Sequence, residues 1–271
     1  MISRIATLLL FTLFLLTSCD VADNGNSNST RGTLQVYLTD APGNYEAVWI
    51  DIQEVRIHRS ENEEIEDDDD GWITISEEPK KVNLLDLTNG KLEVLGETDL
   101  DEGMYSQIRL ILGDDNEVVK NGVTHSLDTP SAQQSGLKLN VNAEIEGGQV
   151  YTLLLDFDAS RSIIEAGNSG KFLLKPVIRA VAFAETGAIE GSIEPAESLP
   201  WVYAIAGTDT VAGTRADAEG EFRLVGLLSG SYNVAINPSE EGYSDEIISD
   251  VDVTAPDTTD LGVINLDEDE E

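Results

Sequence analysis

Apolar and polar residues alternate in short segments along most of the chain, and a period of two is typical of β-strands with one buried face. The longest such segment is Ala47–Arg59, where valine or isoleucine occupies positions 48, 50 and 52 and then positions 55 and 57. The change from even to odd positions predicts a β-bulge near Glu54, because one extra residue moves the following side chains to the other face.

Other segments before residue 184 show the same pattern, separated by acidic or glycine-containing turns. Strands are expected at Thr33–Thr39, Trp72–Ser76, Val82–Leu87 with one turn of helix, Gln107–Leu112, Leu137–Ile145 and Val150–Phe157. Val118–Leu127 is expected to form a hairpin around Asn121-Gly122, a strong two-residue turn signal. No long helical period occurs, so the pattern predicts an all-β fold, with an antiparallel β-sandwich over residues 32–184.

Several short motifs in this region follow one another in a specific order. They are Leu38-Thr39-Asp40-Ala41-Pro42, Leu84-Leu85-Asp86-Leu87 with Asn89-Gly90, Gly103-Met104-Tyr105 with Ile108-Arg109, Pro130-Ser131 with Ser135-Gly136-Leu137-Lys138, Asp156-Phe157-Asp158 with Ser162-Ile163, and Leu174-Lys175-Pro176-Val177-Ile178-Arg179. On these motifs, residues 32–184 resemble the bacterial lipoprotein family described as domain of unknown function 4382 (DUF4382). The resemblance implies a domain type and no established activity.

Residues 187–266 show a different pattern, in which glycines separate short apolar segments. Asp217 and Gly220 predict a turn, and Phe222 and Leu224 after it share one face of a strand. This region resembles the carboxypeptidase regulatory-like domain, a seven-stranded sandwich related in shape to transthyretin and to starch-binding modules. The resemblance implies an accessory domain without catalysis. Two β-sandwich domains in tandem are therefore expected, with an acidic tail at 267–271.

The N-terminus predicts export and lipid attachment. Arg4 precedes an apolar run at 5–16 that is too short to span a bilayer, so residues 1–18 are expected to be a signal peptide. Leu16-Thr17-Ser18-Cys19 resembles the bacterial lipobox, and Cys19 is the only cysteine of the chain. A lipid on Cys19 would anchor the protein to a membrane. Residues 19–31 are small and polar and are expected to form a flexible tether.

Composition narrows the classes of partner. The formal net charge is −36, and removal of residues 1–18, which contain Arg4 and no acid, changes it to −37. Nucleic acid is excluded as a partner, because binding it requires lysine and arginine to neutralise phosphates. We expect an acidic protein at the envelope of a Gram-negative bacterium, on the outer membrane, with a glycan or an envelope protein as its partner.

One acidic segment matches the spacing of a calcium-binding loop. Glu66, Asp68 and Asp70 take positions one, three and five of such a loop, Gly71 takes position six and Glu77 position twelve. Calcium is the only cofactor that the sequence suggests. A run this acidic also matches many spacings by chance, and a solvated hairpin tip is the alternative interpretation.

Two aspartates inside a predicted strand form a carboxylate pair of the kind that serves acid–base chemistry. Asp156 and Asp158 lie two residues apart and share one face of the strand. The cations Lys175, Arg179 and Arg109 occupy comparable strand positions and are expected to join the aspartates in a structural ion-pair network. Catalytic residues are therefore not expected.

A pair of aromatic residues in the second domain provides the other candidate site. Trp201 and Tyr203 lie on one face of a predicted strand. If they are exposed, they can stack on a sugar ring, whereas an inward-facing pair would belong to the core. Three functions remain open: a non-catalytic envelope lipoprotein that presents sandwich domains for binding or assembly, a carbohydrate-binding module, and a carboxylate-dependent hydrolase.

Overall fold

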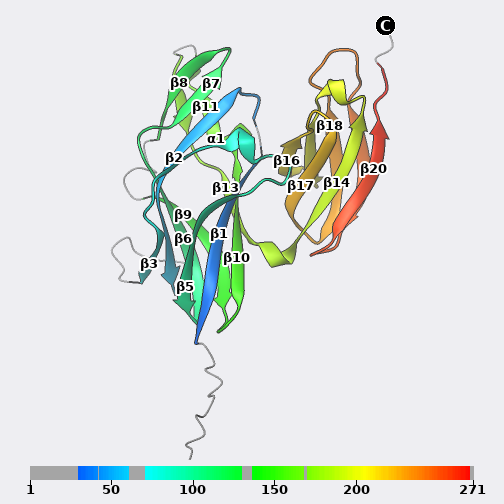
Figure 1. The fold of residues 1–271 in the computed structure, drawn as a ribbon. Coiled ribbons are helices and arrows are strands. Elements are labelled where there is room, and N and C mark those ends of the chain that lie inside the picture. The colour runs from blue at the N-terminus through cyan, green and yellow to red at the C-terminus, as the bar shows by residue number, and fades with distance from the viewer. Residues whose placement is uncertain (1–29, 42, 61–70, 130–135, 168–169, 269–271) are drawn as a thin grey trace, which may run out of the picture.

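The computed structural model describes residues 30–41, 43–60, 71–129, 136–167 and 170–268. Its regular elements are almost all β-strands, which confirms the predicted all-β fold. The strands form two sandwiches that lie side by side in Figure 1, and the chain passes from one to the other at the 3-10 helix η3 (Phe183–Glu185). We call residues 30–182 the N-terminal sandwich and residues 186–268 the C-terminal sandwich. Within the described residues, no helix is long and apolar enough to cross a membrane.

The first sheet of the N-terminal sandwich has four strands in the order β13-β10-β1-β5. Their bounds are β1 Arg31–Ala41, β5 Glu93–Asp101, β10 Val150–Asp158 and β13 Ile178–Ala182. The N-terminal strand β1 lies inside this sheet, antiparallel to β5 and parallel to β10.

The second sheet has nine strands in the order β11-β12-β8-β7-β2-β6-β9, with β3 and β4 also paired to β2. The bounds are β2 Ala47–Arg59, β3 Trp72–Ser76, β4 Lys80–Asn83, β6 Gly103–Leu112, β7 Glu117–Lys120, β8 Val123–Asp128, β9 Leu137–Ile145, β11 Ile163–Glu165 and β12 Phe172–Leu174. The short helices η1 (Leu84–Leu87) and α1 (Ala159–Ser162) also belong to the described part of this sandwich.

The core of the N-terminal sandwich lies between these two sheets. Alternate residues of β1, Leu34, Val36 and Leu38, are fully buried and pack in one cluster with Ile108 of β6 and Phe157 of β10. Burying each such side chain contributes about 1.5–3 kcal/mol. Alternation in the sequence therefore reports which face of each strand meets the other sheet.

The C-terminal sandwich contains seven strands in two sheets, ordered β17-β14-β20 and β16-β15-β18-β19. The bounds are β14 Thr186–Glu194, β15 Trp201–Ala206, β16 Asp209–Arg215, β17 Glu221–Leu228, β18 Gly230–Asn237, β19 Glu246–Val253 and β20 Thr258–Asn265. Its core is a separate cluster that includes Val202, Ala204, Phe222, Leu224 and Val234. The two sandwiches therefore have independent cores.

The bulge predicted near Glu54 is present, because the pairing of β2 with β6 changes register between Ile52 and Glu54. The prediction of an antiparallel sandwich over residues 32–184 is wrong in part, since β1 pairs in parallel with β10 and β12 with β8. Alternation has the same period in both pairing directions, so it could not distinguish them.

Candidate functional site

Some predicted site residues lie outside the described part of the chain. They are Cys19, Glu66, Asp68 and Asp70. Glu77, the last position of the predicted calcium loop, is exposed just after β3. Among the residues that the structure describes, no group of three or more histidine, cysteine or acidic side chains is arranged to hold a metal ion.

Asp156 forms a buried ion pair with Arg179. The two residues face each other across β10 and β13, and Arg179 Nη2 lies 2.9 Å from Asp156 Oδ2. Asp156 is 8% exposed, and burial raises the pKa of its carboxyl group while the charge of Arg179 opposes that rise. The carboxylate is thus held by a partner on the neighbouring strand.

Asp158 has a different structural role. Its Oδ1 accepts hydrogen bonds from Arg161 N at 2.9 Å and from Ser160 Oγ at 2.6 Å, so it caps the N-terminus of α1. Its ion pair is with Arg161, at 3.7 Å. Both aspartates of the candidate acid–base pair therefore have structural partners on their own or a neighbouring element.

Of the predicted five-membered ion-pair network, the structure contains the pair of Asp156 with Arg179. Arg109 belongs to β6 in the nine-stranded sheet, with its guanidinium 4.0 Å from the centroid of the Trp72 ring, whereas Asp156 belongs to the four-stranded sheet. Lys175 is exposed between β12 and β13. Similar strand positions in the sequence do not distinguish Arg179, which lies opposite Asp156, from Arg109, which lies in the other sheet.

Trp201 and Tyr203 project from the outer face of β15, opposite the buried Val202 and Ala204. Both are half-buried, and neither belongs to the core of the C-terminal sandwich. Tyr203 lies beside the N-terminal sandwich, since a Cβ added at Gly213 would lie 3.0 Å from the Tyr203 ring and 3.6 Å from Ala41 Cβ. Burial and then the charge of Asp158 raise the pKa of the Tyr203 hydroxyl. The outer face of β15 therefore meets the other sandwich.

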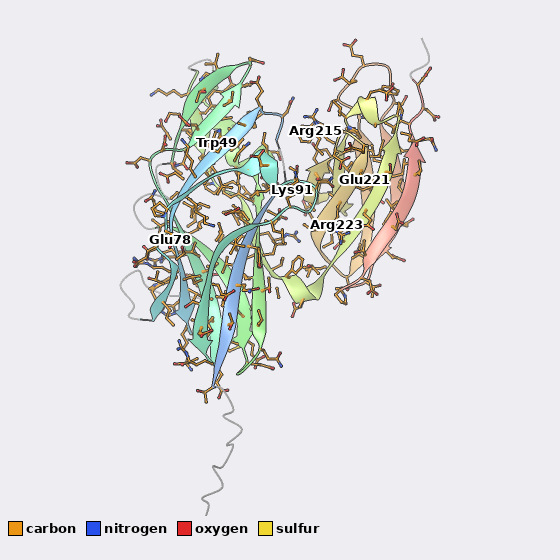
Figure 2. All side chains as sticks on the ribbon, in the orientation of Figure 1. Trp49, Glu78, Lys91, Arg215, Glu221 and Arg223 are labelled. Carbon is orange, nitrogen blue, oxygen red and sulfur yellow. The ribbon has the colours of Figure 1, made fainter. Side chains whose placement is uncertain are left out.

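A polar pocket of about 570 Å³ lies where the two sandwiches meet. The C-terminal sandwich contributes Trp201 and Arg215 to it, and Figure 2 shows Arg215 on the side that faces the N-terminal sandwich. The N-terminal sandwich contributes residues from the β1–β2 connection, the β4–η1 region and the β7–β8 hairpin: Asn44, Tyr45, Glu46, Asn83, Leu85, Asp86, Thr88, Lys120 and Asn121. Neither sandwich alone forms this pocket.

The electrostatics of the pocket are set by pairs of charged and aromatic groups. The guanidinium of Arg215 lies 5.2 Å from the centroid of the Trp201 ring, within the range of a cation–π contact. Lys120 Nζ forms an ion pair with Glu165 at 2.8 Å. Burial raises the pKa of Tyr45 above its usual value, so this phenol remains a hydrogen-bond donor at neutral pH.

Asn89 connects the two sandwiches beside the pocket. Its backbone N–H donates to Thr214 Oγ1 at 2.7 Å, and its side-chain Nδ2 donates to Asp217 Oδ2 at 3.3 Å and to Glu221 O at 3.1 Å. Asn89 has φ +58°, a left-handed conformation that asparagine adopts more readily than most residues. One residue of the η1–β5 connection thus makes three hydrogen bonds to the other sandwich.

The family model described as domain of unknown function (DUF4382) matches residues 31–176, which is more than half of the 271 residues. The chain belongs to the DUF4382 family. The match covers the N-terminal sandwich from β1 to the end of β12. No curated protein matches the sequence.

Several solved structures show distant likeness to the chain. A mutant type II cohesin–X–dockerin complex from Acetivibrio cellulolyticus is 22% identical over 30% of this chain and 56% of that chain, with a TM-score of 0.25. The minor pilin of Streptococcus agalactiae is 10% identical over 88% of this chain and 97% of that chain, with a TM-score of 0.24. The Bacillus anthracis TIE protein is 13% identical over 88% and 34% of the two chains, with a TM-score of 0.24. Likeness this low says nothing about the function of this chain.

Motifs that are distant in the DUF4382 sequence meet at the junction of the two sandwiches. Thr39 and Asp40, Asn89 and Gly90, and Asp156 line a void of about 10 Å³ together with Gly213 and Arg223 of the C-terminal sandwich. This void is barely the size of one water molecule, so these residues form a contact rather than a ligand site. The DUF4382 motifs therefore shape the surface on which the second sandwich rests.

Proposed function

We propose that this chain is a non-catalytic, lipid-anchored binding protein of the Gram-negative outer membrane, and that its binding site is the pocket between the two sandwiches. The observation that carries the proposal is that both sandwiches build this one pocket. Ligand pockets occur preferentially at such boundaries between structural units. The C-terminal sandwich fits the proposed carboxypeptidase regulatory-like accessory domain, and the whole serves to bind a partner.

The use of the acidic side chains supports a role in binding rather than catalysis. Asp156 is paired with Arg179 and Asp158 caps α1, so the candidate acid–base pair is occupied by structural contacts. A carboxylate-dependent hydrolase needs an acid and a base that face the same substrate bond. The two aspartates have no such arrangement.

The lipid anchor is tested by labelling and fractionation. The full chain, expressed in a Gram-negative host with a palmitate analogue, is expected to carry the label and to sediment with outer membranes. A Cys19→Ser variant is expected to lose the label and to appear in the soluble fraction. If the variant keeps both the label and the membrane association, the proposed anchor is wrong.

The binding role is tested by photo-cross-linking in living cells. A benzophenone amino acid placed at Asn44, an exposed residue of the pocket, is expected to form an adduct with an envelope component. The same group at Glu78, which is exposed on the N-terminal sandwich away from the pocket, is the control (Figure 2). Adducts from Glu78 equal to those from Asn44, or none from Asn44, would contradict a binding role for the pocket.

A further inference from the structure

The lining of the inter-sandwich pocket restricts the chemistry of its ligand. Sites for apolar molecules are lined predominantly by hydrophobic side chains. Here Trp201, Tyr45 and Leu85 are accompanied by amides, carboxylates and cations. An apolar ligand would cover these polar groups without offering them hydrogen bonds, which is unfavourable. The lining therefore favours a ligand with many hydroxyl groups.

Arg215 is available to such a ligand. It is exposed, its guanidinium lies beside the Trp201 ring, and its side chain forms no ion pair or hydrogen bond within the described part of the chain. This is notable in a protein with 52 acidic residues and only 16 lysines and arginines. A guanidinium has five N–H donors, and in this position they are adjacent to an aromatic surface.

The pocket offers no excess of positive charge. Its lining cations are Lys120 and Arg215 and its lining acids are Glu46 and Asp86, and Lys120 is also neutralised by its ion pair with Glu165. Since the whole chain carries −36, a polyanion finds no net Coulomb attraction to repay the loss of its hydration, and the guanidinium of Arg215 repels a cation at the same place. The pocket therefore suits an uncharged ligand.

A sugar ring in its neutral form combines these properties. Its faces carry C–H groups that pack on an aromatic ring, and its edge carries hydroxyl groups that both donate and accept hydrogen bonds. We infer that the pocket between the two sandwiches binds a neutral sugar residue of a glycan, with Trp201 against the ring and Arg215 as a donor to its hydroxyl groups. This inference rests on the proposed binding function and names its ligand class.

The test is calorimetric titration of the full chain, purified in detergent, with neutral hexasaccharides of glucose, mannose, xylose and N-acetylglucosamine, and with oligogalacturonate as the acidic probe. At least one neutral probe is expected to bind. Trp201→Ala is expected to weaken this binding about tenfold, since aromatic stacking contributes about that much. Arg215→Gln is expected to weaken it about three- to tenfold, because hydrogen bonds are lost.

One control variant and one control measurement separate a loss of binding from a loss of structure. Trp49→Phe changes a half-buried tryptophan that does not line the pocket, and it should leave the affinity unchanged. The melting temperature of Arg215→Gln should also be unchanged, because that side chain is exposed, so this variant tests binding even if Trp201→Ala proves unstable.

The inference is overturned if Trp201→Ala and Arg215→Gln bind as tightly as the unaltered chain, or if oligogalacturonate binds more tightly than every neutral probe. If no neutral probe binds while Asn44 still cross-links in cells, the ligand class is wrong and the binding function stands. If both experiments fail, the binding function is also wrong.

Discussion

Asp40 provides a sharp test of the electrostatics at the junction. It is 3% exposed, its Oδ1 accepts a hydrogen bond from Ala159 N at 3.1 Å, and its Oδ2 has no hydrogen-bond partner among the described residues. Burial raises the pKa of this carboxyl group well above its usual value, the hydrogen bond from Ala159 opposes the rise, and the charges of Asp156 and Asp158 add to it. The folded protein thus favours the neutral form of Asp40.

The sign of the stability effect follows from this pKa. The folded state holds the proton of Asp40 more tightly than the unfolded state does. The contribution of Asp40 to the free energy of unfolding is therefore fully present below its unfolded pKa of about 3.9, and it is lost as the pH rises through the folded pKa. Asparagine has the same shape, can accept the hydrogen bond from Ala159 and never ionises. Asp40→Asn removes the cost of burying a charge and should raise the free energy of unfolding at pH 7 by about 1–3 kcal/mol, the order of a buried polar group's desolvation penalty, with the amide Nδ2 at the unpartnered position offsetting part of the gain.

The measurement is urea unfolding of the purified chain at pH 7 and pH 4, followed by tryptophan fluorescence. The gain from Asp40→Asn should shrink at pH 4, where Asp40 is protonated more readily in both states. Asp114→Asn is the matched control, because Asp114 is exposed and its replacement removes the same charge from a highly acidic chain. A gain no larger than that of Asp114→Asn, or a gain independent of pH, would refute the reasoning.

Other substitutions test the packing and the contact between the sandwiches. Asn89→Gly keeps a left-handed backbone but loses two side-chain hydrogen bonds, so the free energy of unfolding measured in urea should fall by about 1–2 kcal/mol. Asn89→Ala should lower it by about 1 kcal/mol more, because alanine adopts the left-handed backbone at a cost. Equal losses from the two variants would contradict this account. Gly220→Ala should lower the melting temperature by several degrees, because φ is +81° and the new Cβ would lie 2.3 Å from a backbone carbonyl oxygen; an unchanged temperature would contradict it. Phe157→Ala should cost about 3–5 kcal/mol in the same urea assay, since the ring is fully buried, and a loss below 1 kcal/mol would show that the core collapses around the gap. If residues 66–77 form a calcium loop, calcium should raise the melting temperature of the chain, and Glu77→Gln should abolish that rise. If calcium does not change the melting temperature of the unaltered chain, the proposed calcium site is wrong.

The strands could be predicted well wherever one face is buried. Ala47–Arg59 and Leu137–Ile145 have the bounds expected from alternation, because each alternate side chain meets the opposite sheet. The sequence does not predict the strand Glu93–Asp101, because few of its residues are apolar and only Leu95 and Leu100 are buried. The sequence also does not predict which strands pair with each other, because partners such as β1 and β10 are far apart in the chain.

The site was predictable only in part. Alternation places Trp201 on the face opposite Val202, but every residue of Trp201–Ala206 is apolar, so the sequence does not indicate which face is buried. Nothing local to Tyr45 or Lys120 indicates that they line the same pocket, because that depends on how two separately packed sandwiches meet. The ion pair of Asp156 with Arg179 follows from strand pairing, whereas the capping role of Asp158 depends on where β10 ends.

The position of β1 has a mechanical consequence. This strand starts at Arg31, directly after the proposed tether, and is hydrogen-bonded to β10 on one side and β5 on the other. It ends at Ala41, three residues before the pocket residue Asn44. A ligand pulled away from the membrane would therefore load β1 along its own axis. A force along the strand axis loads the hydrogen bonds to β10 and to β5 together rather than one bond at a time. The strand that follows the proposed tether, β1, is therefore well placed to bear tension.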